Sequence, residues 1–441
     1  MLHSTLRTLL GLAVGDAYGI HFEFMSAEDI SKMYMKPPQR SLGEGIFKFE
    51  AGDFSDDTEM ALLTLYSLMH NLGVKTKHLK QLYTLWAYHA KDIGIQTKKA
   101  LLEDEFDASG EGNGALMRIL PCVVYLHEVL GQNNTRIKES IRTISAITHD
   151  NTTVHAINDF FIDVILHNDL SSHQKTIEDF SKTDGNSGWV MNTARIVYQA
   201  LCHKKQSLMN GLWEIIQKGG DTDTACAIYA AIKSYHTPSI IANMYISLFL
   251  NQKSQKSLEI FFKTQLHYYQ PDQQKMPTLF AGQYPGSKSP SLHAIKLTQL
   301  LSLKIDCVMS LMEEAESSRF TRYQEALYHF NPNIEYFNYP IPDMSVPTKK
   351  QLYDIVHHVQ TLLTSKKRVY IHCWGGHGRT GVVVGALLIY NGYTPQNALA
   401  KIKEERMKTL FGDEPSLQTD EQIKFVLDIT QTARVEQDVH Q

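Results

Sequence analysis

The spacing of apolar residues divides the chain into two unlike parts. Up to about residue 265, apolar positions recur every three or four residues, which is the period of an amphipathic helix. The stretch EMALLTLYSLM, directly after Thr58, is a clear case. The same period predicts helices over residues 2–19, 75–106, 135–168, 188–203 and 211–234, the last interrupted at a pair of glycines. No convincing strand precedes about residue 300, so this part is predicted to be all-α.

Beyond that point, strands and helices alternate. The runs IDCVMSL, IEYFNYPI and RVYI are predicted strands, whereas KKQLYDIVHHVQTLL and VVVGALLIY are predicted helices. This alternation is typical of an α/β domain. Residues 264–290 carry Pro, Gln and Gly without a clear period. We therefore expect one domain at 1–265, a linker at 266–276 and a second domain at 277–441 that ends in a polar tail.

Length, charge and cysteine content narrow the class of protein. The 441 residues suggest two or three domains, and a net charge of −4 gives no reason to expect nucleic acid or an anionic membrane as a partner. The five cysteines are Cys122, Cys202, Cys226, Cys307 and Cys373. Because they form neither a disulfide framework nor a zinc pattern, a reducing compartment is favoured. The apolar stretch LLGLAVG is too short for a membrane span, so we expect a soluble, cytoplasmic protein.

Glycines mark two places of close packing or ligand approach. Gly11, Gly15 and Gly19 are four residues apart and share one face of the first predicted helix, so another element should pack very close there. A glycine-rich turn at 110–114 precedes a helix predicted to begin near Ala115. Such a turn is a possible ligand site, but it is also an ordinary connector.

Two acidic clusters lie at the predicted starts of helices. SDDT spans residues 55–58 and DTDT spans residues 221–224. Helix capping explains either cluster, since Ser and Asp are common caps and acids favour the first turn. One helix needs only one cap, however, and two clusters of oxygen donors suit hard divalent cations. The sequence leaves open whether these distant clusters meet in the fold.

The stretch HCWGGHGRTG, residues 372–381, lies between a predicted strand and a predicted helix. A strand, a glycine-rich turn and a helix N-terminus together form an anion site. Cys373 at its base is expected to act as a thiolate nucleophile, and Arg379 to bind phosphate oxygens with its planar guanidinium. A buried structural cysteine is the alternative. The spacing of Cys, five residues, Arg and Thr in this context favours phosphate-ester cleavage.

Ordered motifs give the first part of the chain a family resemblance. GLAVGDAYGIHFEF, GDFSDDTEM, GNGALMRILP, ITHD, SGWVMNTA and GGDTDTACAIYAAI occur over about residues 5–235. In this order they resemble the ADP-ribosylglycohydrolase family, which includes the dinitrogenase-reductase-activating glycohydrolase and the ADP-ribosyl-acceptor hydrolases. The resemblance implies magnesium-dependent removal of ADP-ribose from modified side chains, with two Mg²⁺ ions, or Mn²⁺ in their place.

The same resemblance assigns roles to residues in these motifs. It implies that the metal ligands are Ser55, Asp56, Asp57, Asp221, Asp223 and Thr224. It places Asn113, Gly114 and His149 in motifs that line the ADP-ribose pocket. Glu23 corresponds to the acidic residue near the scissile bond, although an isolated Glu is equally a solvated surface group. Either Glu23 or Asp57 would orient the attacking water, and the sequence does not decide between them.

The second part resembles the dual-specificity, cysteine-dependent protein phosphatases over about residues 277–430. The resemblance extends beyond the cysteine loop to LFAGQYPG and YPIPDMSVPT. It implies that Asp343 is the general acid, that His372 positions the thiolate and that Thr380 assists breakdown of the phosphocysteine. Gly375, Gly376 and Gly378 allow the loop to approach a bound phosphate. An Asp in a proline-containing turn is the plainer interpretation of Asp343.

A hydrolase with two activities is the leading interpretation of the sequence. Its expected partners are an ADP-ribosylated protein or a small molecule containing ADP-ribose, and a phosphoprotein or small phosphate ester, without nucleic acid or membrane. One alternative is a protein that binds ADP-ribose or phosphate without turnover. The other is successive processing of one phosphorylated ADP-ribose derivative by the two domains.

Overall fold

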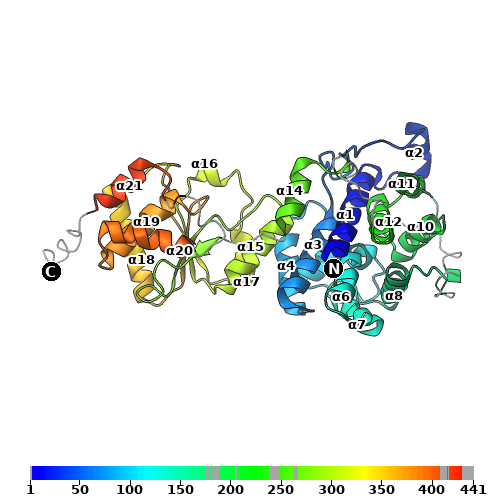
Figure 1. Cartoon of the computed structure of the whole chain (residues 1–441), viewed down its shortest axis with the longest axis horizontal. Coiled ribbons are helices and arrows are strands. Elements are labelled where there is room, and N and C mark those ends of the chain that lie inside the picture. Colours follow the sequence, from blue (N-terminus) through cyan, green and yellow to red (C-terminus); the bar gives the residue numbers. More distant parts are fainter. Residues whose placement is uncertain are drawn as a thin grey trace. The chain divides into compact units, whose positions relative to one another are not determined.

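In the computed structural model, the chain folds into two compact units (Figure 1). The first runs from Met1 to Lys263, and the second holds Thr264–Lys288 and Leu292–Gln441. The structure describes residues 2–171, 173, 176, 178, 179, 188–203, 206–237, 246, 248–261, 267–407, 415 and 417–429. The predicted polar tail at 430–441 lies outside these residues.

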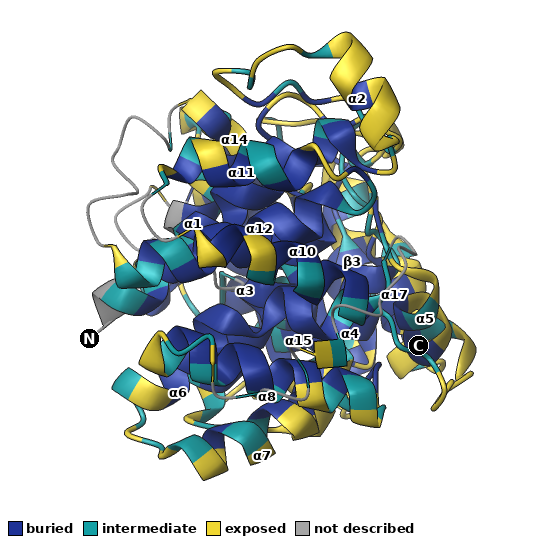
Figure 2. Ribbon diagram, turned by 90° about the vertical axis from the view of Figure 1, so that its right-hand side faces the viewer, coloured by how far each residue is buried: buried dark blue, intermediate teal, exposed yellow. Residues whose placement is uncertain are grey.

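Two helices that are far apart in sequence form the centre of the first unit. Helix α12 (Thr222–His236) packs along α1 (Leu2–Gly19), and Figure 2 shows α12 as a buried helix among its neighbours. A Cβ atom on Gly15 would lie 2.2 Å from the carbonyl oxygen of Cys226, and one on Gly19 would lie 2.5 Å from the Cα atom of Asp223. The predicted close approach to the glycine face is therefore confirmed, and its partner is α12.

We expect Gly15→Ala to destabilise the first unit by about 1–3 kcal/mol or more, because the added methyl group overlaps the backbone of α12. Calorimetric melting of the full chain measures the effect as a lower transition temperature. Gly94→Ala is the matched control, since its added methyl group meets no atom closer than Thr97 Oγ1 at 3.9 Å. Equal melting of the two variants would contradict this account of α1.

The remaining helices of the first unit surround this pair. They are α2 (Ala27–Met33), α3 (Asp56–Asn71), α4 (Thr76–Ala87), α5 (Ile95–Lys98), α6 (Leu120–Glu128), α7 (Asn134–Ser145), α8 (Thr152–His167), α10 (Val190–Cys202), α11 (Leu208–Ile216) and α14 (Gln252–Phe261). Short helical turns add η1 (Ile20–Phe22), η2 (Lys99–Glu103) and η3 (Asn113–Arg118). The described residues of this unit form no strand, only two isolated bridges, so the predicted all-α class is confirmed.

Two of the predicted helices are interrupted in the structure. The helix predicted over 75–106 ends at Ala87 and resumes at Ile95, and the turn between them carries the buried Asp92. The helix predicted over 135–168 divides into α7 and α8 at a turn that holds His149. The glycine-rich turn at 110–114 opens the 3₁₀ turn η3, and α6 begins only at Leu120.

The second unit is built on a five-stranded sheet in the order β1-β2-β5-β3-β4. The strands are β1 (Tyr268–Tyr269), β2 (Leu279–Gly282), β3 (Cys307–Ser310), β4 (Glu335–Asn338) and β5 (Val369–His372). All neighbours are parallel except β1 and β2. The central β5 is buried at every position, which explains its continuous apolar run.

Helices complete this unit, and the predicted α/β class is confirmed. They are α15 (Pro290–Ser302), α16 (Glu314–Ser317), α17 (Gln324–Phe330), α18 (Lys349–Thr364), α19 (Gly378–Tyr390), α20 (Pro395–Met407) and α21 (Asp420–Leu427). Apolar residues of the sheet, such as Val369 and Ile371, share one buried cluster with Ile355 of α18 and Val382 of α19. This packing holds β5 and α19 against each other, and the loop between them contains Cys373.

The expectation of no strand before about residue 300 is wrong. β2 lies at 279–282, and β1 lies inside the stretch assigned to a linker. The sequence LFAG carries little strand signal because alanine and glycine have low β-propensity. Parallel pairing with the whole of β5 makes it a strand. Among the described helices, none is both long enough and apolar enough to cross a membrane.

Candidate active sites

The two acidic clusters lie together in the first unit. SDDT lies at the N-terminus of α3, and DTDT lies at the N-terminus of α12. The hydroxyl of Thr224 donates a hydrogen bond of 3.2 Å to Asp57 Oδ2, and the hydroxyl of Ser55 donates to the same oxygen at 3.2 Å. The close packing of α1 against α12 and α3 brings the two helix starts to this point.

Helix capping does not occupy the carboxylates of these two clusters. Ser55 is the N-cap of α3, and Asp16 of α1 accepts hydrogen bonds from the backbone amides of Ser55 and Thr58. Asp16 Oδ2 also accepts from the Thr58 hydroxyl at 2.5 Å. At the start of α12, Asp221 makes no capping hydrogen bond with its side chain. The capping explanation therefore accounts for Ser55 and leaves the carboxylates of both clusters available.

Among the described residues, no positively charged side chain is paired with the carboxylates of this cluster. Burial and the neighbouring Asp221 raise the pKa of Glu23 to about 9. Burial and Asp16 raise the pKa of Asp56 to about 7, and the same two causes raise that of Asp57. In the described part of the chain, no lysine or arginine forms an ion pair with these carboxylates. Buried carboxylates without a cationic partner require a proton or a bound cation.

Asp92 joins the cluster from the turn between α4 and α5. Glu23, Asp92 and Asp223 each place one carboxylate oxygen within 4.8 Å of the others. Burial and the charge of Asp56 raise the pKa of Asp92 to about 10. Asp92 is not predicted as a site residue from the sequence, because a single Asp in a stretch with helical period resembles a solvated surface residue.

The donor set fits hard divalent cations. The oxygens Asp57 Oδ1, Asp223 Oδ1 and Glu23 Oε2 are buried and have no hydrogen-bond partner among the described residues. Carboxylate and hydroxyl oxygens are the ligands that Mg²⁺ and Mn²⁺ prefer. The cluster can therefore hold cations whose charge offsets that of the acids.

The three residues assigned to a ligand pocket contact the protein in different ways. Asn113 Nδ2 donates to Asp221 Oδ2 at 2.8 Å and to Thr193 Oγ1 at 3.0 Å, so it orients an acid of the cluster. His149 is buried below the glycine-rich turn, where a Cβ atom on Gly114 would lie 2.9 Å from its ring. Burial lowers the pKa of His149 to about 3, which keeps the ring neutral.

The cysteine loop of the second unit follows β5, whose end lies between the ends of β2 and β3. Gly282 of β2 and Ser310 of β3 both pair with His372, the residue before Cys373. Ligands of parallel sheets bind at this carboxyl edge. Gly376 has a φ of +77°, and a Cβ atom there would lie 2.4 Å from the backbone of Gly282. The loop packs too closely against β2 for any other residue.

Packing also explains the other two glycines of the loop. A Cβ atom on Gly375 would lie 2.7 Å from the ring of His377, and one on Gly378 would lie 2.7 Å from Gln422 Nε2. At both positions an added side chain would come too close to a neighbouring side chain of the protein, so glycine favours the observed packing of the loop. Their predicted role toward a ligand stays a prediction.

Arg379 is buried and held by two carboxylates. Its Nη1 and Nη2 atoms donate to the two oxygens of Glu316 at 2.6 and 2.8 Å. Nη2 also lies 2.9 Å from Asp343 Oδ1. A two-pronged pair of this kind fixes the plane of the guanidinium. Asp343 is therefore next to the loop. Glu316 is a candidate site residue that the sequence does not predict, because its acidic stretch EEAES is typical of a solvated surface.

His372 and Thr380 lie inside the second unit with different partners. Burial lowers the pKa of His372 to about 4, so its ring is neutral. Nδ1 lies 3.0 Å from the carbonyl oxygen of Cys373 and must donate to it, and Nε2 therefore accepts from the Tyr323 hydroxyl at 2.7 Å. His372 thus holds the backbone of Cys373. The Thr380 hydroxyl is buried without a hydrogen-bond partner among the described residues.

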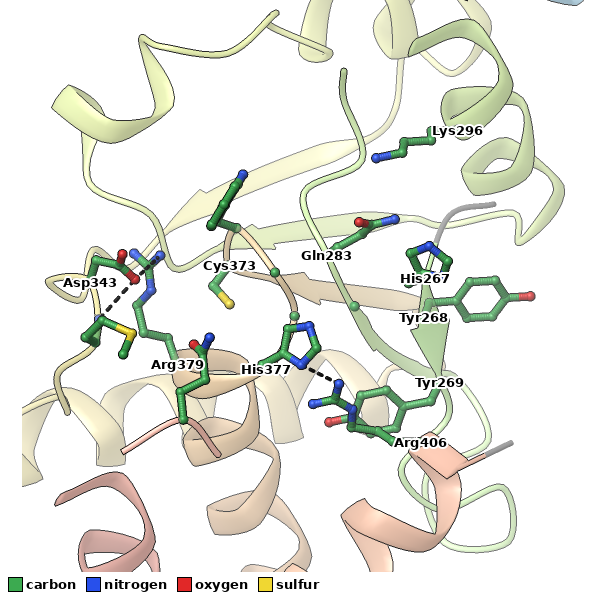
Figure 3. Close-up of a pocket in the computed structure, with 16 residues that line it drawn as sticks. His267, Tyr268, Tyr269, Gln283, Lys296, Asp343, Cys373, His377, Arg379 and Arg406 are labelled. Atoms are coloured by element: carbon green, nitrogen blue, oxygen red, sulfur yellow. Dashed lines mark hydrogen bonds and ion pairs between the residues drawn. The ribbon is translucent and has the colours of Figure 1, made fainter. Parts of the chain in front are cut away.

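A pocket of 470 Å³ opens over the cysteine loop. Figure 3 shows Arg379 and Asp343 on one side of Cys373, and Lys296, His267 and Arg406 on the other. A pocket with a thiol at its base and a fixed guanidinium beside it suits an oxyanion.

Two family models match the chain. Residues 3–165 match ADP-ribosylglycohydrolase. Residues 286–393 match the DSP-PTPase phosphatase of polymorphic toxin systems. Both families are hydrolases, one acting on ADP-ribosylated and the other on phosphorylated substrates. The two resemblances expected from the motifs are confirmed.

Curated relatives cover one part of the chain or the other. The "Putative ADP-ribosyl glycohydrolase L543" of Acanthamoeba polyphaga mimivirus is 24% identical over 305 residues, covering 56% of this chain and 90% of the relative. "ADP-ribosylarginine hydrolase Tri1" of Pseudomonas putida is 29% identical over 161 residues, covering 32% and 40%. "Cyclin-dependent kinase inhibitor 3" of Rattus norvegicus is 32% identical over 71 residues, covering 16% and 34%. The chain spans less than half the length of the last two relatives.

Proposed function

We propose that this chain, which joins an ADP-ribosylglycohydrolase domain to a dual-specificity phosphatase-like domain, is a bifunctional hydrolase. The first unit removes ADP-ribose from modified side chains in a magnesium-dependent reaction. The second unit cleaves phosphate esters through a cysteinyl-phosphate intermediate. The observation that carries the first activity is the set of buried carboxylate oxygens without partners where α3 and α12 meet.

In the first unit, the metal ligands are Ser55, Asp56, Asp57, Asp221, Asp223 and Thr224. Two Mg²⁺ ions bound there would fix the ribose hydroxyls and increase the acidity of a water molecule. Glu23 or Asp57 accepts the proton of that water as its oxygen attacks the anomeric carbon. The bond from that carbon to the acceptor side chain breaks, and the leaving atom of the side chain takes up the proton, which regenerates the carboxylate. Asn113 keeps Asp221 in place.

Asp92 belongs to the same machinery because its carboxylate lies within 4.8 Å of those of Glu23 and Asp223. Three carboxylates so close together cannot all be charged without a cation. Asp92 is therefore a further ligand or a proton acceptor beside Glu23. The name of the Pseudomonas putida relative supports arginine as the modified side chain.

In the second unit, the Cys373 thiolate attacks phosphorus, and the ester oxygen leaves with the proton of Asp343. A phosphoryl oxygen replaces Asp343 as a partner of Arg379 Nη2, and Glu316 keeps the guanidinium in plane. Water then attacks the phosphocysteine and gives its proton to Asp343, releasing phosphate. The Thr380 hydroxyl donates a hydrogen bond to the departing sulfur.

Removal of metal separates the two activities. We expect EDTA to abolish the release of ADP-ribose from ADP-ribosylarginine by the full chain, and Mg²⁺ to restore it. Hydrolysis of p-nitrophenyl phosphate should continue in EDTA, because the thiol, guanidinium and carboxylate of that site need no metal. Both reactions are followed in the same preparation, by chromatography of ADP-ribose and by absorbance of nitrophenolate.

Two results of the EDTA experiment would contradict the proposed first activity. Binding of ADP-ribose without its release, at any Mg²⁺ concentration, would replace the first activity by a binding function. Release that persists in EDTA would contradict the metal site. The five free cysteines support a reducing compartment, so we infer that both reactions occur in the cytoplasm.

A further inference from the structure

The pocket over Cys373 extends well beyond the place that one phosphate occupies. Its far side is lined by Lys296 of α15, His377 of the cysteine loop and Arg406 of α20, together with His267. Among the described lining residues, the one carboxylate is Asp343, which lies beside Arg379 on the opposite side of Cys373. Among the described lining residues, the far side therefore holds cationic side chains and no carboxylate.

Lys296 is a largely buried cation without a carboxylate partner in the described part of the chain. Its one hydrogen bond that the structure records is a long one of 3.4 Å to the carbonyl oxygen of Gly286. Burial lowers the pKa of Lys296 to about 8, and among the described residues no anion counteracts this effect. A buried ammonium group is costly unless an anion accompanies it.

His377 and Arg406 present donors on the same side of the pocket. An Nη atom of Arg406 is hydrogen-bonded to His377 Nδ1, and arginine can only donate. Nδ1 therefore accepts, and the neutral ring carries its proton on Nε2, which makes that atom a donor. Arg406 is itself 5% exposed and donates to the carbonyl oxygen of Pro415, so its position is fixed by the fold.

We propose that Lys296, His377 and Arg406 form a second anion subsite, and that the phosphatase substrates are small phosphate monoesters that carry a second phosphate group. This inference rests on the proposed function of Cys373 and adds the substrate class. The phosphate over Cys373 is cleaved, whereas the second phosphate stays intact in the subsite and leaves with the product. The reaction therefore converts a bisphosphate into a monophosphate and inorganic phosphate.

The size and charge of the pocket favour a small molecule over a phosphoprotein. Its 470 Å³ lies within the range of about 300–1,000 Å³ that is usual for small-molecule sites. A phosphorylated side chain brings a single phosphate to the thiol, whereas a second phosphate on a small molecule would supply a further anion to the cations beyond it. Charge-assisted hydrogen bonds to a second phosphate would use all three donors.

Binding to the inactive full chain tests the subsite without turnover. Alkanediol bisphosphates of increasing length, and the matching monophosphates, are titrated into the Cys373→Ser variant by calorimetry. For the length that fits, we expect the bisphosphate to bind at least about tenfold more tightly than its monophosphate. Equal affinity at every length would overturn the proposal, and this comparison requires no further substitution.

A second substitution assigns the effect to Lys296. Adding Lys296→Met should reduce the preference for the bisphosphate about tenfold. The control is Lys350→Met, which removes an exposed lysine of α18 and should leave the preference unchanged. An unchanged preference in Lys296→Met would remove Lys296 from the subsite.

Turnover by the active chain separates this inference from the proposed function. Higher kcat/KM for the fitting bisphosphate than for p-nitrophenyl phosphate supports both. Hydrolysis of p-nitrophenyl phosphate without any preference for bisphosphates, or with preference for a phosphotyrosine peptide, overturns the second subsite alone. Preferential bisphosphate binding without hydrolysis of any ester overturns the phosphatase activity and retains the subsite.

Discussion

Replacing Cys373 by Ser is expected to reduce hydrolysis of p-nitrophenyl phosphate on the order of 10⁴-fold or more, as loss of a catalytic nucleophile does in other enzymes. A serine hydroxyl fills the same space below the pocket. At neutral pH, however, it is a far weaker nucleophile than a thiolate. Steady-state kinetics of the purified full chain, followed by nitrophenolate absorbance, measures the loss.

Two controls make this result specific. Cys202→Ser removes an exposed thiol of the first unit and should leave both activities unchanged. Cys373→Ser itself should leave ADP-ribose release unchanged, because Cys373 lies in the other unit. If Cys373→Ser retained more than a small fraction of the hydrolysis, the thiol mechanism would be abandoned. Loss of ADP-ribose release in the same variant would mean that the two activities are coupled.

The second large effect concerns Asp223 in the acidic cluster. Asp223→Asn should reduce ADP-ribose release at least about 100-fold, since removing even an outer partner of a metal ligand commonly costs 10–100-fold. In the absence of metal, the same substitution should raise thermal stability. Asn has no charge to bury, whereas burial and the charge of Glu23 raise the pKa of Asp223. The stabilisation of the wild-type unit by added Mg²⁺ should be largely lost in the variant.

Asp163→Asn is the contrasting control. Asp163 is also largely buried, but Lys138 lies 2.8 Å and His173 2.7 Å from its carboxylate. Removing this acid leaves its partners without an anion and should lower stability, while ADP-ribose release keeps its dependence on Mg²⁺. Melting curves of both variants are recorded with and without Mg²⁺. Without metal, the melting temperature should rise in Asp223→Asn and fall in Asp163→Asn. A lower melting temperature for metal-free Asp223→Asn would contradict the uncompensated acidic cluster.

Local sequence patterns predict most of the helices and strands, but only some residues of the candidate sites. The loop from Cys373 to Arg379 was predicted between a strand and a helix, because the apolar runs on both sides differ in length and residue type. Likewise, the glycines of α1 predicted a close neighbour, since their spacing places them on one face. In each case the cause and its effect lie within a few residues.

Other features depend on contacts that no local pattern records. Ser55 and Asp16 cap the N-terminus of α3, but Asp16 belongs to α1. The hydrogen bond between Asp57 and Thr224 joins residues that are 167 positions apart. β2 is a strand through its pairing with β5 and with β1, and neither pairing is visible in the local sequence.

By itself, the sequence predicted two fold classes, most of the helices, the strands beyond about residue 300, and the two acidic clusters and the cysteine loop that are candidates for the chemistry. Only the tertiary structure decided what surrounds them: Asp92 beside Glu23, Glu316 on Arg379, Tyr323 behind His372, and Lys296 beyond Cys373. Helical and strand periods are local consequences of backbone geometry and remain readable along the chain. The partners of a buried charge, in contrast, are selected by the packing of distant elements, which leaves no period in the sequence.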